Sequence, residues 1–357
     1  MLRLDFSWFA LAAVLAVPLQ AQVPLTGGRV TQTQGEAAAR TGPCTPSGAS
    51  HPMTYVVGGH QLNTLVTSAD PDTRKFLVFV PGDYHPLAPP YPVVYVFPGT
   101  GQTGQDIQGN TSWSQAADQF GFIVVYPEGL PYLLQDGTTK RKWNTPAVVQ
   151  DVDPSELPLA DDVRFIREVH HTIGGHLNID CDRVYATGFS NGGAFVKTRV
   201  RVGLADLFAA TSSAAGIGVD TNFPPEYFPA DGETFRPHFG IGGTQDDGFL
   251  DHCIALGDLD PGDPFPMQVA DIIATPCIWT PVTTLAAANG LDPWAIQPLE
   301  HAEYTQILWD SVLLPGPGPT EYLFRVLPGL GHEYPSGNNY PTDYVPIYYT
   351  WMSQFTR

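Results

Sequence analysis

The sequence predicts an α/β fold of one domain, in which helices cover both faces of a mostly parallel central sheet. Three observations support this prediction. Short β-branched or aromatic runs alternate along the chain with helical patterns, and several of these runs end at Pro-Gly or Gly-rich turns. No internal repeat or linker divides the chain. Of its 357 residues 43% are hydrophobic, which is enough to build one large core.

The expected elements alternate between strands and helices. Each predicted strand is a run of β-branched or aromatic residues, and each predicted helix carries apolar residues at helical spacing. The C-terminal helix has Pro341 near its first turn, where proline is tolerated. The predicted strands are residues 75–80, 93–97, 122–126, 183–187, 208–213, 238–242 and 322–327, and the predicted helices are residues 112–120, 161–173, 191–204 and 341–355.

The chain divides into three predicted regions. Residues 1–21 are typical of a signal peptide, because a short apolar run precedes the small residue Ala21; a buried N-terminal helix is the alternative. Residues 22–52 form a loose leader. Residues 53–357 form the domain, which an irregular, Pro- and Gly-rich insertion interrupts at about residues 251–314. We therefore expect a secreted, extracellular protein.

The charge of the chain limits its partners. It contains 36 acidic and 17 basic residues, which gives a formal net charge of −19. Nucleic acid requires a positive surface, so we expect no nucleic-acid partner. No segment offers the roughly 20 apolar residues that a membrane span needs, so we expect no membrane partner. These features favour a neutral substrate, and we expect a monomer.

Four cysteines are present: Cys44, Cys181, Cys253 and Cys277. An even number in an exported chain suggests two disulfides. Their spacings match no zinc pattern, so we expect no metal site. Three pairings are possible, and we favour Cys44–Cys181 with Cys253–Cys277, the second of which closes a local loop.

The strongest functional motif is Gly188-Phe189-Ser190-Asn191-Gly192, which lies between a predicted strand and a predicted helix. This context is that of a nucleophile elbow, in which the two glycines prevent a clash and the serine lies at a helix N-terminus that favours negative charge. The motif predicts Ser190 as a nucleophile and a fold of the α/β-hydrolase type. A Gly-rich turn whose serine caps a helix is the alternative.

A serine nucleophile needs a base, and this fold orders its residues as serine, acid and histidine. His332 lies in a Gly-rich loop after a predicted strand, near the C-terminus. His252 and His301 also follow the serine, but they lie in the irregular region. Asp246 follows another predicted strand and would orient the base. Asp247 is the alternative acid, and a solvated acidic turn is the non-catalytic alternative.

The intermediate of acyl transfer needs two hydrogen-bond donors for its oxyanion. The backbone N–H of Asn191 is one candidate. The other lies in the loop after residues 93–97, where Pro98 has no N–H and Thr100 is therefore favoured; a simple Pro-Gly turn is the alternative. This chemistry requires no cofactor. Activity should fall below about pH 6.5 as His332 becomes protonated.

In chain order, these motifs resemble those of the polyhydroxybutyrate depolymerase and feruloyl esterase group of extracellular α/β-hydrolases. The resemblance runs from about Thr54 to Trp351 and is most specific at residues 183–193, around the serine. The other matching segments are residues 98–103, 143–144, 161–166, 243–246, 288–290 and 331–335.

Three positions depart from this family. Pro98 replaces a histidine, Tyr334 replaces a tryptophan, and Lys142 stands where many relatives have a cysteine, so their disulfide scheme does not transfer. Trp143, Tyr334 and Trp279 are candidate walls of the substrate cleft, with a place in the core as the alternative.

The resemblance implies a serine carboxylic-ester hydrolase that acts on an ester, which is attached in some cases to a polymer. The expected substrates are feruloyl or acetyl esters of plant polysaccharide, or related short esters. An extracellular polyhydroxyalkanoate depolymerase is the alternative within the same chemistry. A non-catalytic secreted binding protein on the same fold is the alternative of another class.

Overall fold

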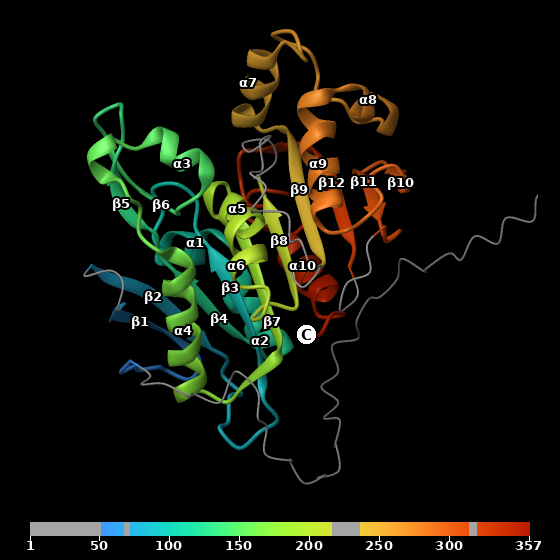
Figure 1. Ribbon diagram of the computed structural model, residues 1–357. Coiled ribbons are helices and arrows are strands. Elements are labelled where there is room, and N and C mark those ends of the chain that lie inside the picture. Colours follow the sequence, from blue (N-terminus) through green and yellow to red (C-terminus); the bar gives the residue numbers. More distant parts are fainter. Residues whose placement is uncertain (1–50, 68–71, 216–235, 314–319) are drawn as a thin grey trace, which may run out of the picture. The chain divides into compact units, whose positions relative to one another are not determined.

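The computed structural model describes residues 51–67, 72–215, 236–313 and 320–357, all of which belong to one compact unit (Figure 1). The predicted signal peptide and all but the last two residues of the predicted leader lie outside the described residues. Within the described part of the chain, no helix combines the length and the apolar composition that crossing a membrane requires.

The centre of the fold is a ten-stranded sheet (Figure 1). In spatial order the strands are β1 (Gly59–Val66), β2 (Thr73–Val80), β4 (Ile123–Pro127), β3 (Tyr91–Phe97), β7 (Ile179–Phe189), β8 (Ala210–Ala214), β9 (His238–Gln245), β12 (Tyr322–Gly331), β11 (Tyr304–Trp309) and β10 (Ile296–His301). The six neighbouring strands from β4 to β12 in this order are all parallel, so their carboxyl ends meet at one edge of the sheet. Antiparallel strands extend the sheet on both sides.

Each of the seven predicted strands is present in this sheet, with ends that differ by up to four residues. Among the strands that the sequence did not predict are β1 and a small separate hairpin formed by β5 (Leu130–Leu133) and β6 (Thr139–Lys142). Both lack a continuous apolar run. In β1 the side chains alternate between intermediate or exposed positions and a few buried ones, as expected of an edge strand.

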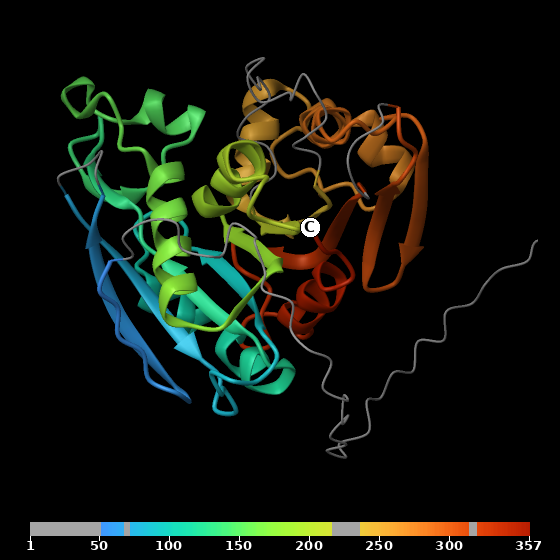
Figure 2. The ribbon, with the colours of Figure 1, turned by 60° about the horizontal axis from the view of Figure 1, so that its bottom comes forward.

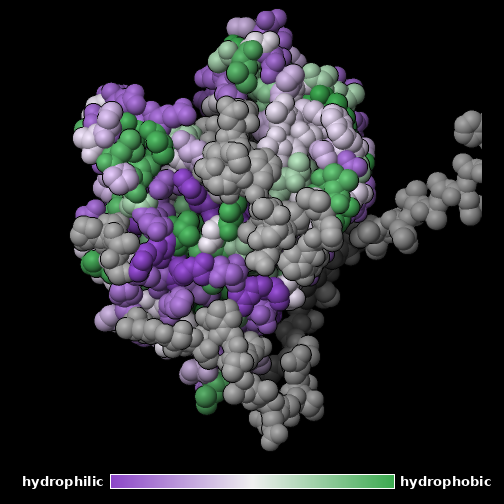
Figure 3. All heavy atoms as spheres, in the orientation of Figure 1, coloured by the Kyte–Doolittle hydropathy of each residue, from purple (hydrophilic) through white to green (hydrophobic). Residues whose placement is uncertain are grey.

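Helix α4 (Asp162–His176) illustrates how the helices are fixed to the sheet (Figures 1 and 2). Its apolar side packs on the sheet, and its outer side carries charged residues, which gives the hydrophilic surface over α4 in Figure 3. Asp161 caps its first turn, because the carboxylate accepts a hydrogen bond from the backbone N–H of Arg164.

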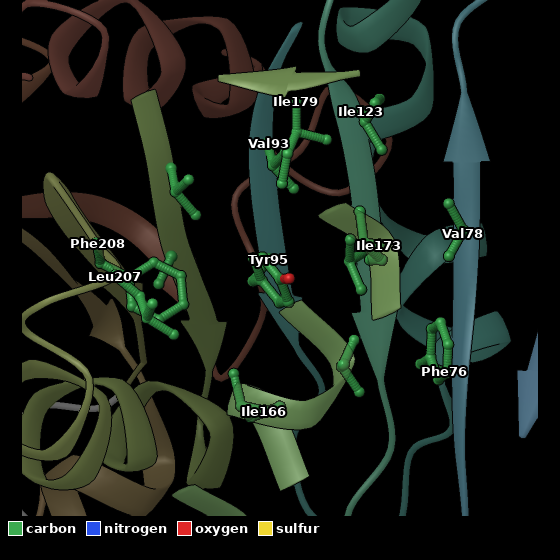
Figure 4. Packing of buried hydrophobic residues seen from close by; sticks show 14 of the residues in the cluster. Phe76, Val78, Val93, Tyr95, Ile123, Ile166, Ile173, Ile179, Leu207 and Phe208 are labelled. Atoms are coloured by element: carbon green, nitrogen blue, oxygen red, sulfur yellow. The ribbon is translucent and has the colours of Figure 1, made fainter. Parts of the chain in front are cut away.

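The core lies on both faces of the sheet because successive strand residues point to opposite sides. In β2, Phe76 and Val78 belong to the cluster under α4, whereas Leu77 and Phe79 belong to the cluster on the other face. Figure 4 shows the first cluster, in which Tyr95 of β3 lies close to the helix residues. The second cluster is covered by α1 (Gly104–Asn110), α2 (Trp113–Phe120) and α10 (Tyr344–Met352).

The helix predicted at residues 191–204 is one continuous helix whose hydrogen-bond pattern changes in its middle. It comprises α5 (Asn191–Phe195), a π-helical turn (Val196–Val200) and α6 (Arg201–Gly203). Such π-turns often occur near functional sites.

The region that we expected to be an irregular insertion is largely regular, which corrects that prediction. It contains most of α7 (Asp247–Leu256), α8 (Val269–Ala274), α9 (Pro276–Ala288) and the hairpin of β10 and β11, which extends the main sheet. The prediction was wrong because it took the many prolines of this region as a sign of irregular structure. Pro276 lies at the first turn of α9, and Pro281 is tolerated inside it.

The predicted disulfide between Cys253 and Cys277 is present and joins α7 to α9. Cys181 is also disulfide-bonded. Its predicted partner, Cys44, lies outside the described residues.

A buried ion pair fixes the start of α4 to the sheet. The guanidinium of Arg74 donates to Asp162 at 2.5 Å, both side chains are at most 1% exposed, and Asp162 also accepts from the backbone N–H of Asn144. We expect Asp162→Ala to lower the free energy of unfolding by about 3–5 kcal/mol, because it leaves the Arg74 charge buried without this carboxylate. Urea denaturation measures the effect.

The matched control is Asp161→Ala. In the described structure the Asp161 carboxylate caps α4 and makes no ion pair with Arg74, so its loss should cost about 1 kcal/mol. Equal losses for the two variants would contradict the role given to the Arg74–Asp162 pair.

Candidate active site

Ser190 occupies a strained turn between β7 and α5. Its φ of 50° and ψ of −119° are unusual for a residue with a side chain. Glycine is required at both flanking positions, because a side chain there would clash with neighbouring backbone atoms. A Cβ at Gly188 would lie 2.4 Å from the carbonyl oxygen of Gly192, and a Cβ at Gly192 would lie 2.3 Å from that of Phe97. The turn has the geometry of the nucleophile elbow that the sequence predicts.

Three predicted residues from separate loops meet at this turn. Nε2 of His332 lies 2.9 Å from Oγ of Ser190, and Nδ1 of His332 lies 2.8 Å from Oδ1 of Asp246. Ser190 follows β7, Asp246 follows β9, and His332 follows β12, so the carboxyl ends of three parallel strands bring them together. This hydrogen-bond chain has the geometry of a nucleophile, a base and an orienting acid.

Asp246 is fixed from two sides. Its side chain is nearly fully buried, and it caps α7 by accepting a hydrogen bond from the backbone N–H of Phe249. The alternative acid, Asp247, is exposed, and its carboxylate accepts from the N–H of Gly248. The structure therefore pairs His332 with Asp246.

The acidic partner raises the pKa of His332 above its ordinary value of 6.5. The hydrogen bond to Asp246 is the largest cause, partial burial opposes it, and the charges of Asp246 and Asp247 add to the increase. His332 is still partly exposed, because 37% of its side chain is accessible to solvent.

This shift changes the expected pH dependence. Only neutral His332 can accept the serine proton, and a raised pKa keeps the proton bound to a higher pH. We expect kcat/KM to decline with acidification around a midpoint above pH 6.5, rather than at about pH 6.5 as the ordinary pKa suggested. A pH profile with p-nitrophenyl acetate measures this midpoint. A rate that stays constant to pH values well below 6.5 would contradict His332 as the base.

A pocket of about 170 Å³ opens beside the serine. Thr100, Asn191 and Ala215 are among its lining residues. Ala215 has a φ of 51°, and among the described residues it shares a positive φ with only one other non-glycine residue, Ser190. Both strained residues thus line the same pocket, and strain of this kind concentrates at functional sites.

The loop after β3 is held in one conformation by several hydrogen bonds. The N–H of Gly99 donates to the side chain of Gln102, and the N–H of Gly101 donates to the carbonyl of Arg141. Among the hydrogen bonds of the described residues, none uses the backbone N–H of Thr100 or of Asn191. Both residues line the pocket, so these two groups remain the candidate oxyanion donors.

The prediction that three aromatic residues line the substrate cleft is wrong, since none of them is a lining residue of the pocket. Trp143 is 1% exposed and donates from its indole to the carbonyl of Pro98, so it supports the loop after β3 from behind. Tyr334 is 4% exposed and its hydroxyl pairs with Thr187. Trp279 lies on α9, and its side chain belongs to the hydrophobic core.

Several lining residues were missed or misjudged. Thr145, the ion pair of Lys142 with Asp151, and His252 of α7 are also lining residues of the pocket. The sequence offers His252 only as an alternative base, and the structure places His332 at hydrogen-bond distance from Ser190. His301 is remote from the pocket and packs against Tyr304. No local pattern marks these residues, because β6, α3 (Pro146–Asp151) and α7 are brought together only by folding.

A larger cavity, of about 690 Å³, lies elsewhere, over α4. Its lining residues include Arg164, Arg167 and Glu168 and no residue of the Ser190 site. It offers charged side chains but no nucleophile beside a base. Among the described residues, no group of three or more His, Cys, Asp or Glu side chains could hold a metal ion.

Comparison with known proteins gives partial matches to esterases. No family model matches the chain. The chain is 29% identical over 174 residues to the bifunctional acetylxylan esterase/xylanase XynS20E of Neocallimastix patriciarum, which corresponds to 49% of this chain and 22% of that protein. It is 31% identical over 125 residues to the esterase candidate NocK of Nocardia uniformis subsp. tsuyamanensis, or 35% of this chain and 33% of that protein. The chain thus spans no more than about a third of these relatives' length.

A solved structure extends the comparison to the whole fold. The acetyl xylan esterase from Aspergillus awamori superimposes with a TM-score of 0.52 at 16% identity, over 82% of this chain and 99% of that chain. The fold is that of the α/β-hydrolases. The parallel central strands, helices on both faces and the serine turn after β7 agree with this assignment, so the predicted fold class is confirmed.

Proposed function

We propose that this α/β-hydrolase is a serine carboxylic-ester hydrolase. The observation that carries the proposal is the continuous hydrogen-bond chain from Ser190 through His332 to Asp246 at the edge of a pocket. The similarity to proteins named as esterases supports the same chemistry.

In the proposed reaction, Oγ of Ser190 attacks the ester carbonyl while Nε2 of His332 takes the hydroxyl proton. Asp246 holds the imidazole in the required tautomer and stabilises its protonated form. The backbone N–H groups of Asn191 and Thr100 stabilise the oxyanion. His332 then protonates the leaving alcohol, and water releases the acid from the acyl-enzyme by the same steps.

Among the expected substrates, we propose acetyl or other short acyl esters of a hydroxylated compound such as a polysaccharide. The small volume of the pocket suits a short acyl group. The three aromatic residues that were expected to hold a feruloyl ring are buried and do not line the pocket. Relatives named for acetylxylan esterase activity support the same choice.

A substrate panel tests this proposal. It compares p-nitrophenyl acetate, acetylated xylan, methyl ferulate and hydroxybutyrate oligomers, each with the wild-type chain and with Ser190→Ala. Preference for the acetyl esters supports the proposal. Preference for the ferulate or for the oligomers would replace acetyl esters with one of the other expected substrates.

The alternative of a non-catalytic binding protein requires its own experiment. A fluorophosphonate probe reacts only with an activated serine, so labelling of the wild-type chain at Ser190 supports an enzyme. A chain that stays unlabelled at a pH where His332 is neutral would favour the binding protein.

We also propose that the protein is exported. The disulfide between Cys253 and Cys277 supports an oxidising compartment. N-terminal sequencing of protein recovered from the culture medium tests this proposal, with cleavage after Ala21 as the expected result. Recovery of the uncleaved chain from the cytoplasm would contradict it.

A further inference from the structure

Two buried polar atoms beside the proposed nucleophile make no hydrogen bond within the described part of the chain. They are Oγ1 of Thr145 and Nε2 of His252, and both residues line the pocket that contains Ser190 and His332. Buried polar groups are nearly always paired, because an unpaired one retains the full cost of its desolvation. Two such atoms in one pocket suggest that a ligand supplies the partners.

The fold does not use the hydroxyl of Thr145, although its position would allow it. Thr145 is the N-cap residue of α3, where a threonine hydroxyl normally accepts a hydrogen bond from the first turn. Here the hydroxyl makes no such bond, and the residue is fully buried. The fold therefore buries this hydroxyl without giving it a partner.

His252 is held in place by its neighbours. It lies on α7, the helix whose N-cap is Asp246, and the next residue, Cys253, is fully buried and joined to Cys277 of α9. The same short helix thus begins at Asp246 and carries the imidazole whose Nε2 has no partner. The disulfide of Cys253 fixes the helix backbone next to His252.

The remaining pocket lining fits a small group that is partly polar. Lys142 and Asp151 form an ion pair of 2.7 Å on the lining, whereas Val148 and Phe249 provide apolar contacts. An ester with a hydroxyl near its reacting carbonyl combines the two kinds of surface. The hydroxyl group of such an ester could accept a hydrogen bond from one of the two residues, Thr145 or His252, and donate a hydrogen bond to the other residue.

We propose that Thr145 and His252 are substrate-binding residues that select esters with a hydroxyl group next to the ester bond. This inference rests on the proposed esterase function, and it adds which group of the substrate, besides the ester, the pocket binds. The hydroxyl belongs either to the acyl group, as in a hydroxyacyl ester, or to the alcohol, as in a polyol ester. The chemistry is the same in both cases, since an unhydroxylated analogue leaves both buried atoms unpaired.

The test measures the ratio of kcat/KM for a hydroxylated ester to that for its analogue without the hydroxyl. One arm compares ethyl 3-hydroxybutyrate with ethyl butyrate and reports on the acyl side. The other compares glycerol monoacetate with propyl acetate and reports on the alcohol side. We expect the wild-type chain to prefer the hydroxylated ester in one arm. Thr145→Val and His252→Leu should each reduce that ratio about tenfold, the value of one hydrogen bond.

Conservative variants and a matched control separate binding from structure. Thr145→Ser and His252→Gln retain a polar atom and should keep most of the preference. Thr172→Val makes the same change as Thr145→Val at another buried threonine, on α4, whose hydroxyl donates to the carbonyl of Glu168, and it should leave the ratio unchanged.

Thermal unfolding distinguishes a binding role of Thr145 from a structural one, because a structural role would make the Tm of Thr145→Val lower than that of the wild type. Thr145→Val removes an unpaired buried hydroxyl, so its Tm should equal or exceed that of the wild type, whereas Thr172→Val loses a made hydrogen bond and should have a lower Tm.

Two outcomes would overturn the inference: no preference in either arm, or a preference that both Thr145→Val and His252→Leu retain. In either case, wild-type hydrolysis of p-nitrophenyl acetate that is lost in Ser190→Ala would leave the esterase proposal standing. Absence of that hydrolysis would instead refute the esterase proposal itself.

Discussion

Replacing Ser190 by alanine is expected to lower kcat for p-nitrophenyl acetate by about 10⁶-fold and to abolish labelling by a fluorophosphonate. The change removes the atom that forms the acyl-enzyme in the proposed mechanism, while His332 and Asp246 stay in place. The strained backbone should persist, because it is imposed by the close approach of Gly188 and Gly192 to neighbouring backbone. Steady-state kinetics and mass spectrometry of the labelled chain measure both effects.

Ser212→Ala is the matched control for this experiment. Ser212 is a fully buried serine in the adjacent strand β8, and it is absent from the pocket lining. Its variant should keep wild-type kinetics and labelling. If Ser190→Ala retained most of its activity, another residue would have to be the nucleophile, and the proposed mechanism would fail.

Asp246→Asn is expected to lower kcat by about 10⁴-fold with little change in fold. An asparagine can still accept the hydrogen bond that caps α7, so the helix should remain. The neutral amide cannot stabilise protonated His332 and favours the wrong tautomer. Because the carboxylate is the largest cause of the raised His332 pKa, the variant's residual activity should also extend to lower pH. Kinetics across a pH series measure both effects.

Asp247→Asn is the control, since it removes a neighbouring charge without breaking a hydrogen bond to His332. The charge of Asp247 is the smallest of the effects that raise the His332 pKa. We therefore expect kcat within a few-fold of wild type and only a slight shift of the pH profile to lower values. A loss in Asp247→Asn as large as that in Asp246→Asn would contradict the choice of acid.

Much of the site could be predicted because its residues lie in local patterns. The Gly-x-Ser-x-Gly turn is a short-range requirement: each glycine prevents a contact below 2.5 Å that any side chain would make. The positions of Asp246 and His332 follow from chain order, since parallel strands place the residues after their carboxyl ends at one edge. Hydrophobic runs marked the central strands because these are buried on both faces.

Other features depended on contacts between distant parts of the chain. An aromatic residue near a motif can point into a cleft or into the core, and the sequence does not distinguish the two. Trp143 points inward because its indole finds an acceptor at Pro98 and packs on Phe97 and Phe195. The hairpin of β10 and β11 was missed because β10 has mostly exposed side chains, so only its pairing with β11 reveals it.

The sequence by itself determined the fold class, the nucleophile turn and the order of the three residues that meet there. These depend on backbone conformation and on period-two or helical patterns, which neighbouring residues encode. The sequence favoured Asp246 and left Asp247 open, whereas the tertiary structure shows the contact between Asp246 and His332 and brings Thr145 and His252 to the same pocket. Both arrangements depend on side-chain direction, and packing between α3, α7 and the sheet sets that direction over more than a hundred residues of chain.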